Sequence, residues 1–268
     1  MNINGTEAET LESLSRKATS PAHYTRLLSR HNLITDTSGH APTYVQANLL
    51  ILPEKHASAF HDLCLRNPVP CPLLAITSPG NPHQLLPISL PSLKSAAENN
   101  ENSCFDHDFD IRTDFPSYRV YENGQLKSTN VRDLLSLWKN DHVGFLIGCS
   151  YSFEDALAKA GLPPRQFETN TTVAMYRTNI PLLPAGIFTN ACCIVSMRPY
   201  PASDIEAVRA ITSTFLATHG EPVAWGWDAV HKLGIRDIAV PDFGSPQLMR
   251  EGDVPVFWVC IIIYFLVL

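Results

Sequence analysis

Residues 145–157, FLIGCSYSFEDAL, join an apolar run directly to an amphipathic segment. The uncharged run VGFLIGCS over 143–150 has the length of one strand and is typical of a buried one. Ser152 follows it, and Asp155 lies three residues later in a capping-box position, so a helix is expected to begin there. The sequence Gly-Leu-Pro-Pro then ends that helix. This stretch therefore predicts a buried strand that turns at once into a helix.

Similar segments alternate along the rest of the chain. Apolar runs of strand length occur at 44–53 and 191–197. Apolar residues at helical spacing predict helices over 21–30, 54–66, 131–139 and 203–220, the last with Ser203 and Glu206 as a second capping box. Alternating strands and helices predict a mixed α/β (α+β) fold, as one globular domain or one domain with a smaller second lobe.

Three segments are expected to lie outside the regular fold. The polar residues 1–20 read as a disordered leader, and the acidic stretch 88–110 reads as a surface loop within a domain spanning 21–260. The apolar end VPVFWVCIIIYFLVL contains a strand-like first half, but its length exceeds one strand and falls short of the roughly 20 residues of a membrane helix. We expect residues 261–268 to be a tail foreign to the domain, and a membrane anchor is the alternative.

Composition excludes several classes of function. The chain has 268 residues, 17% of them charged, and a net charge of −6, which disfavours a nucleic-acid partner because phosphate contacts need a basic face. Seven cysteines without a CxxC pair do not indicate zinc. Asp106, Asp108 and Asp110 imitate the start of a calcium loop, but Ile111 and Ser117 stand where glycine and glutamate are needed. We therefore expect no metal.

The N-terminus bears on the compartment. It lacks the apolar core of a secretory signal, so reduced thiols in the cytoplasm are expected. Glu7, Glu9 and Glu12 disfavour a mitochondrial presequence, and the mitochondrial matrix remains the alternative.

The turn at 148–152 is the first candidate site. A helix N-terminus offers unpaired N–H groups and a positive dipole end, which bind anions such as carboxylates. The hydroxyls of Ser150 and Ser152 would add to such a pocket. The thiol of Cys149 would have a lowered pKa at a helix N-terminus and could act as a nucleophile. The alternatives are an ordinary capped turn and a cysteine that serves as a small buried apolar residue.

Two arginines form the second candidate group. MYRTNIP places Tyr176, Arg177 and Asn179 close together, and Arg198 leaves an apolar strand in SMRPYP. Arginine can bind a carboxylate through two parallel hydrogen bonds, but buried ion pairs explain such arginines equally well. Gln46 and Asn48 share one face of the strand at 44–53 and could bind the same ligand or satisfy buried backbone groups.

Taken in order, these motifs resemble one family. YVQANLLILP, RNPVPCPLL, RTDFPSYRVY, FLIGCSYSFEDAL, MYRTNIP, SMRP and PVFW are similar to segments of the D-glutamate cyclase family, also described as hydro-lyases, over residues 23–260. The resemblance implies a soluble intracellular carbon–oxygen lyase that converts D-glutamate to 5-oxo-D-proline and water. It also implies a small acidic substrate, and a homo-oligomer is compatible with it. We expect no cofactor, because the reaction requires no nicotinamide, flavin or phosphate group and the sequence has no Gly-rich phosphate loop. A non-catalytic carboxylate-binding protein and an inactive truncated family member are the alternatives.

The chemistry of that reaction suggests roles for the candidates. Arg177 and Arg198, with Asn179, would anchor carboxylates, and the N–H groups and hydroxyls of residues 149–152 would stabilise an oxyanion. Tyr176 or a histidine would move the proton.

Overall fold

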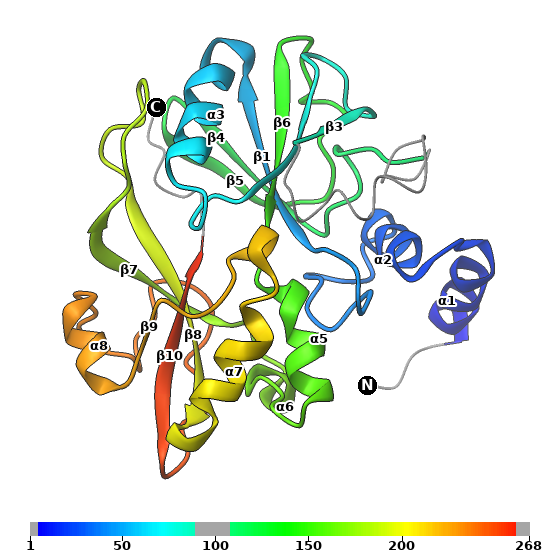
Figure 1. The fold of residues 1–268 in the computed structure, drawn as a ribbon. Coiled ribbons are helices and arrows are strands. Elements are labelled where there is room, and N and C mark those ends of the chain that lie inside the picture. The colour runs from blue at the N-terminus through cyan, green and yellow to red at the C-terminus, as the bar shows by residue number, and fades with distance from the viewer. Residues whose placement is uncertain (1–4, 89–107, 261–268) are drawn as a thin grey trace.

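The computed structural model describes residues 5–88 and 108–260 (Figure 1). Its helices are α1 (Gly5–Lys17), α2 (Pro21–Arg30), α3 (Ala57–Arg66), α5 (Tyr151–Lys159), α6 (Gln166–Thr169), α7 (Ile205–Thr212) and α8 (Trp227–Lys232), with 3₁₀ turns η1 (Glu54–His56), η2 (Ala202–Asp204) and η3 (Leu216–Thr218). Its strands are β1 (Ala47–Pro53), β2 (Leu73–Thr77), β3 (Leu85–Pro87), β4 (Tyr118–Glu122), β5 (Gln125–Val131), β6 (His142–Gly148), β7 (Ala174–Pro181), β8 (Cys192–Pro201), β9 (Ala224–Trp225) and β10 (Asp253–Cys260). The predicted α+β fold is confirmed.

The strands form two four-stranded antiparallel sheets and one hairpin. The first sheet has the order β1-β6-β2-β3, the second has the order β7-β8-β10-β9, and β4 pairs with β5. Figure 1 shows the first sheet in the upper half of the molecule and the second in the lower half. Because β6 lies between β1 and β2, its residues from Val143 onward are buried, as its uncharged sequence predicts.

Helices cover both sheets with apolar side chains. Phe60 and Leu63 of α3 pack against Phe145 and Ile147 of β6. On the second sheet, α5 and α7 cover one face, where Phe153 and Val208 meet Trp258, and α8 covers the other. The α5 helix therefore follows a strand of one sheet but packs on the other, so its first turn lies where the two sheets meet.

Gly148 makes this junction sterically feasible. A Cβ atom at this position would lie 2.0 Å from the carbonyl oxygen of Ala217, which no side chain can tolerate. The glycine thus lets the end of β6 pass directly beneath the η3 segment.

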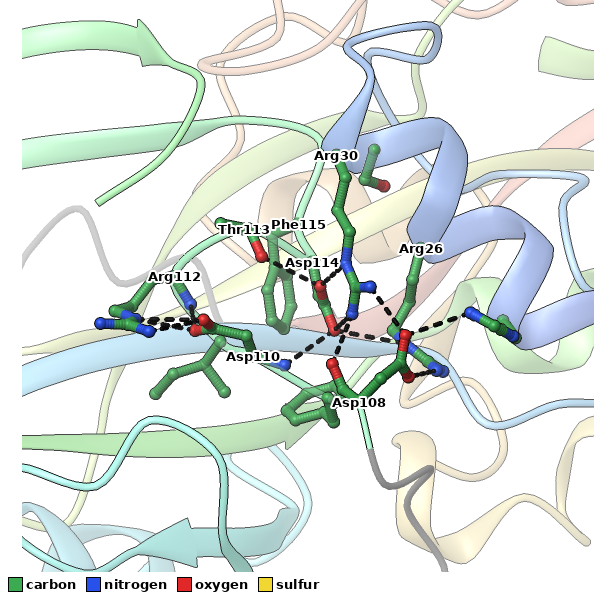
Figure 2. Close-up of polar contacts among 12 residues, drawn as sticks. Arg26, Arg30, Asp108, Asp110, Arg112, Thr113, Asp114 and Phe115 are labelled. Carbon is green, nitrogen blue, oxygen red and sulfur yellow. Dashed lines mark hydrogen bonds and ion pairs between the residues drawn. The ribbon is translucent and has the colours of Figure 1, made fainter. Parts of the chain in front are cut away.

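Ion pairs connect the segment that begins at Asp108 to α2 (Figure 2). Arg30 donates from Nε to Asp114 Oδ1 at 2.5 Å and from Nη1 to Asp108 Oδ2 at 2.7 Å. Arg26 pairs with the same two aspartates, at 3.0 Å to Asp108 Oδ1 and 3.2 Å to Asp114 Oδ2. Two carboxylates are thus balanced by two guanidiniums, and the chain leading to β4 is held in place.

Several local predictions were wrong. Residues 131–139 do not form a helix, because β5 extends to Val131 and the backbone N–H of Leu134 then donates to the carbonyl of Arg112. The predicted helix at 203–220 is divided into η2, α7 and η3, and the hydroxyl of Ser203 bonds Asp204 and does not cap the helix. Within the expected leader 1–20, residues Gly5–Lys17 form the helix α1.

None of the helices within residues 5–88 and 108–260 has the length and hydropathy of a membrane span. Residues 261–268 lie outside the described residues, as does most of the predicted acidic loop.

Candidate active site

A large cleft opens beside the first turn of α5. Its volume is about 2080 Å³, and it runs along β1 between the α5 turn and the β4–β5 hairpin. At the α5 end it is lined by Gln46, Asn48, Cys149, Ser150 and Tyr151. All of these residues except Tyr151 were candidates from the sequence. The structure therefore brings four predicted side chains to one end of one cleft.

The first turn of α5 differs in detail from the predicted capping box. Ser150 takes the N-cap position in a helical conformation and makes no side-chain cap. The Ser152 hydroxyl accepts a hydrogen bond of 2.8 Å from the backbone N–H of Gln46. Its predicted role as the helix cap was wrong, because the α5 turn packs against the start of β1 and this packing recruits the hydroxyl.

Arg198 lies directly behind this turn, in a fully buried ion pair. Its Nε and Nη2 atoms donate to Glu154 Oε1 at 3.1 and 2.5 Å, and both side chains are at most 1% exposed. The guanidinium packs against two neighbouring rings, 5.1 Å from the centroid of Phe153 and 5.4 Å from that of Trp258. Burial acts to lower the pKa of Arg198, but the Glu154 carboxylate more than offsets this and raises it.

The charge of Arg198 is therefore matched inside the protein. Its contact with the cleft is indirect, through a 3.0 Å hydrogen bond from Nη2 to Ser150 Oγ. Because that bond occupies a lone pair of the Ser150 oxygen, the hydroxyl hydrogen remains to be donated elsewhere. Of the two explanations that the sequence left open for Arg198, the structure shows the buried ion pair, and the guanidinium reaches the cleft wall through the Ser150 hydroxyl.

Cys149 is a protonated thiol at neutral pH. Burial at the end of β6 raises its pKa to about 11, against smaller lowering effects from the Tyr151 backbone N–H and the Asn48 side chain. The expected lowered pKa was wrong, because desolvation outweighs the helix N-terminus here. The thiol is thus a proton donor rather than a ready nucleophile.

The remaining predicted residues lie elsewhere. Tyr176 is packed under α8, and its hydroxyl donates to the carbonyl of Ile238 at 2.5 Å. Arg177 is half exposed and lies 3.7 Å, Nε to Oδ1, from Asp242. Asn179 lies against Gly234, near the end of α8.

The two candidate arginines therefore do not converge on one ligand. Across the β7–β8 ladder Arg177 is opposite Ile194, four residues before Arg198. At about 3.3 Å per residue, this separates the two positions by about 13 Å along the strand. The functional roles assigned to Tyr176, Arg177 and Asn179 remain predictions.

Sequence reasoning missed two buried titratable groups at this junction. Glu154 follows Ser150 by four residues and so lies on the same helix face, which the FEDAL sequence could have indicated. His219, which follows η3, is 2% exposed, and burial lowers its pKa to about 4. Its Nδ1 lies 2.9 Å from the carbonyl oxygen of Val69, which can only accept, so Nδ1 carries the proton of the neutral ring.

The cleft combines a neutral thiol, an oriented hydroxyl, an amide and the start of a helix at one end. The model of a family described as D-glutamate cyclase matches residues 143–265, from β6 onward. Three relatives bear the name "Putative hydro-lyase". That of Schizosaccharomyces pombe is 44% identical over 93% of this chain and 78% of its own length. Those of Rhodopseudomonas palustris and Bordetella petrii are 45% and 47% identical over 90% and 89% of this chain and over 80% and 83% of their own lengths.

This chain belongs to the D-glutamate cyclase family of hydro-lyases. The matched range contains Cys149, Ser150, Glu154 and Arg198, so the α5 turn and the ion pair behind it lie within the family's domain.

Proposed function

We propose that the chain cyclises D-glutamate to 5-oxo-D-proline with release of water, at the α5 end of the cleft. The family and the hydro-lyase relatives support a lyase. The observation that carries the site is the wall formed by the Cys149 thiol and the Ser150 hydroxyl, the latter oriented by a buried guanidinium.

The reaction needs a nucleophilic amine and a leaving oxygen. The α-ammonium gives up a proton, and the nitrogen lone pair attacks the carbon of the side-chain carboxyl group. The new C–N bond closes a five-membered ring, and one carboxyl oxygen leaves. The nitrogen loses two protons in all, and both end in the water that is released. Since both reacting groups belong to one molecule, holding them in the right geometry supplies much of the rate.

The side chains of the cleft suit the second half of this reaction. Cys149, protonated at neutral pH, would give a proton to the departing oxygen and regain one from the amine. The hydroxyl of Ser150 would donate to the oxyanion of the tetrahedral intermediate. Asn48, which lines the same end of the cleft, would bind the second carboxylate.

The test is incubation of the purified chain with D-glutamate, followed by chiral chromatography for 5-oxo-D-proline, with L-glutamate as the parallel substrate. Cys149→Ala should lower kcat by about 100-fold or more, the usual contribution of a positioned acid. Cys192→Ala is the matched control, because Cys192 is an exposed thiol. A folded protein that forms no product, or a Cys149→Ala variant with wild-type turnover, would exclude this assignment.

A protein that only binds small carboxylates is the second candidate. The occupied hydroxyl of Tyr176 favours it, because this hydroxyl already donates to the carbonyl of Ile238 and is withdrawn from proton transfer. A rise in melting temperature with D-glutamate but without product would identify such a binder.

A further inference from the structure

The loop between α2 and β1 forms part of the cleft wall. We call residues 37–46 the cleft loop; Thr37, Ala41, Thr43 and Tyr44 all line the cleft. Ala41 and Thr43 have φ values of 47° and 73°. Left-handed backbone is unfavourable for alanine and more so for β-branched threonine, so contacts elsewhere must hold this loop in shape.

Gln46 closes the cleft loop at its base. Its side-chain Nε2 donates to the carbonyls of Thr37 at 3.0 Å and His40 at 2.8 Å, and the Thr37 hydroxyl donates to its Oε1. Its backbone N–H donates to Ser152 Oγ of α5. Gln46, predicted as a ligand-binding residue, thus uses its side-chain amide to fold the loop.

A second contact joins the loop to the buried ion pair. The hydroxyl of Ser38 donates to Glu154 Oε2 at 2.9 Å. The other carboxylate oxygen of Glu154 accepts from Arg198 and, at 2.7 Å, from Gln166 Nε2. The Glu154 carboxylate therefore contacts both parts of the site. One oxygen binds the cleft loop, and the other binds the guanidinium that orients Ser150.

We propose that Glu154 is a positioning residue that couples the cleft loop to Ser150, and that Ser38 is its contact on the loop. The inference rests on the proposed function, because it takes the cleft loop as one wall of the substrate site. Loss of the Ser38 hydroxyl would leave Arg198, Ser150 and Cys149 in place while the loop loses its hold on α5. Substrate binding would weaken, and the chemical step would not change.

The test is Ser38→Ala, a small substitution on a partly buried loop. A hydrogen bond to a charged group is strong enough that KM for D-glutamate should rise about tenfold with kcat unchanged. Ser203→Ala is the matched control, because the Ser203 hydroxyl is exposed and bonds only the neighbouring Asp204 among the described contacts. Glu154→Gln should lower kcat as well as raise KM, since it also disturbs Arg198, and circular dichroism would establish whether that variant folds.

A second readout does not depend on turnover. Tyr44 is 40% exposed within the cleft loop, so chymotrypsin cleavage after it, identified by mass spectrometry, reports on the loop. Ser38→Ala should be cut there severalfold faster than wild type or Ser203→Ala. Unchanged cleavage, or a fall in kcat at constant KM, would overturn the coupling. If no variant turns over D-glutamate, the proposed function fails, and the cleavage rates alone decide whether Ser38 holds the loop.

Discussion

Removing one member of the buried ion pair should be far more harmful than removing both. Arg198→Met keeps an unbranched apolar stem against Phe153 and Trp258 but leaves the Glu154 carboxylate buried without its charged partner. Breaking a buried pair in this way destabilises proteins by about 3–5 kcal/mol, whereas replacing both partners with apolar residues is often nearly neutral. The free energy of unfolding of a whole domain is only about 5–15 kcal/mol, so the single variant should lose a large part of it.

The double variant Arg198→Met with Glu154→Met separates these contributions. It removes the uncompensated charge and leaves only the Ser38 hydroxyl and the Gln166 amide without their acceptor. It should therefore be more stable than Arg198→Met by about 2 kcal/mol or more. Both variants lose the same guanidinium contacts, so they differ only at position 154: in the buried carboxylate and its hydrogen bonds from Ser38 and Gln166.

Equilibrium urea unfolding followed by circular dichroism measures these differences at constant m value. In thermal melts, the single variant should unfold about 10 °C below wild type, from about 2–4 °C per kcal/mol for a chain of this size. A single variant within 1 kcal/mol of wild type, or a double variant less stable than the single one, would refute the reasoning that a desolvated carboxylate dominates the loss.

Two further predictions follow from pKa values. With a pKa of about 11, Cys149 should react slowly with iodoacetamide at pH 7.5 and faster as the pH rises toward 11. The exposed Cys192 should react first. Fast labelling of Cys149 at neutral pH would contradict this prediction. His219 is neutral when folded, with a pKa of about 4 against about 6.5 when unfolded, so the unfolded chain binds more protons between these values. The lowered pKa of His219 therefore contributes up to about 3 kcal/mol to the free energy of unfolding. This contribution is complete above pH 6.5 and is lost as the pH falls toward 4. In His219→Gln, the free energy of unfolding measured with urea should change less between about pH 4 and 6.5 than in wild type. If it changes as steeply as in wild type, other groups cause the loss of stability.

Short-range patterns were sufficient for the elements next to the cleft. The uncharged run of β6 and the amphipathic start of α5 predicted a strand followed at once by a helix, and Pro21 marked the start of α2. These predictions succeeded because burial on both faces of a strand, and periodic apolar residues in a helix, leave their signature in adjacent residues. The failed helix at 131–139 has the same apolar spacing, but pairing of β4 with β5 uses its first residue.

Long-range contacts decided which candidates share a site. Arg177 and Arg198 looked alike in sequence, but strand register placed one beside Asp242 and the other, fully buried, against Glu154. The helix N-terminus suggested a reactive Cys149, and burial by the surrounding chain reversed the direction of its pKa shift.

The amino-acid sequence by itself determined the α+β class, the family resemblance and the strand-to-helix turn at the cleft, because each depends on residues that are neighbours along the chain. Only the tertiary structure decided the partners of Glu154, since Ser38 and Arg198 reach it across 116 and 44 residues. Such partners are set by how two sheets and a helix pack together, and ionic and hydrogen-bonding groups act over a few ångströms in space regardless of their separation in sequence.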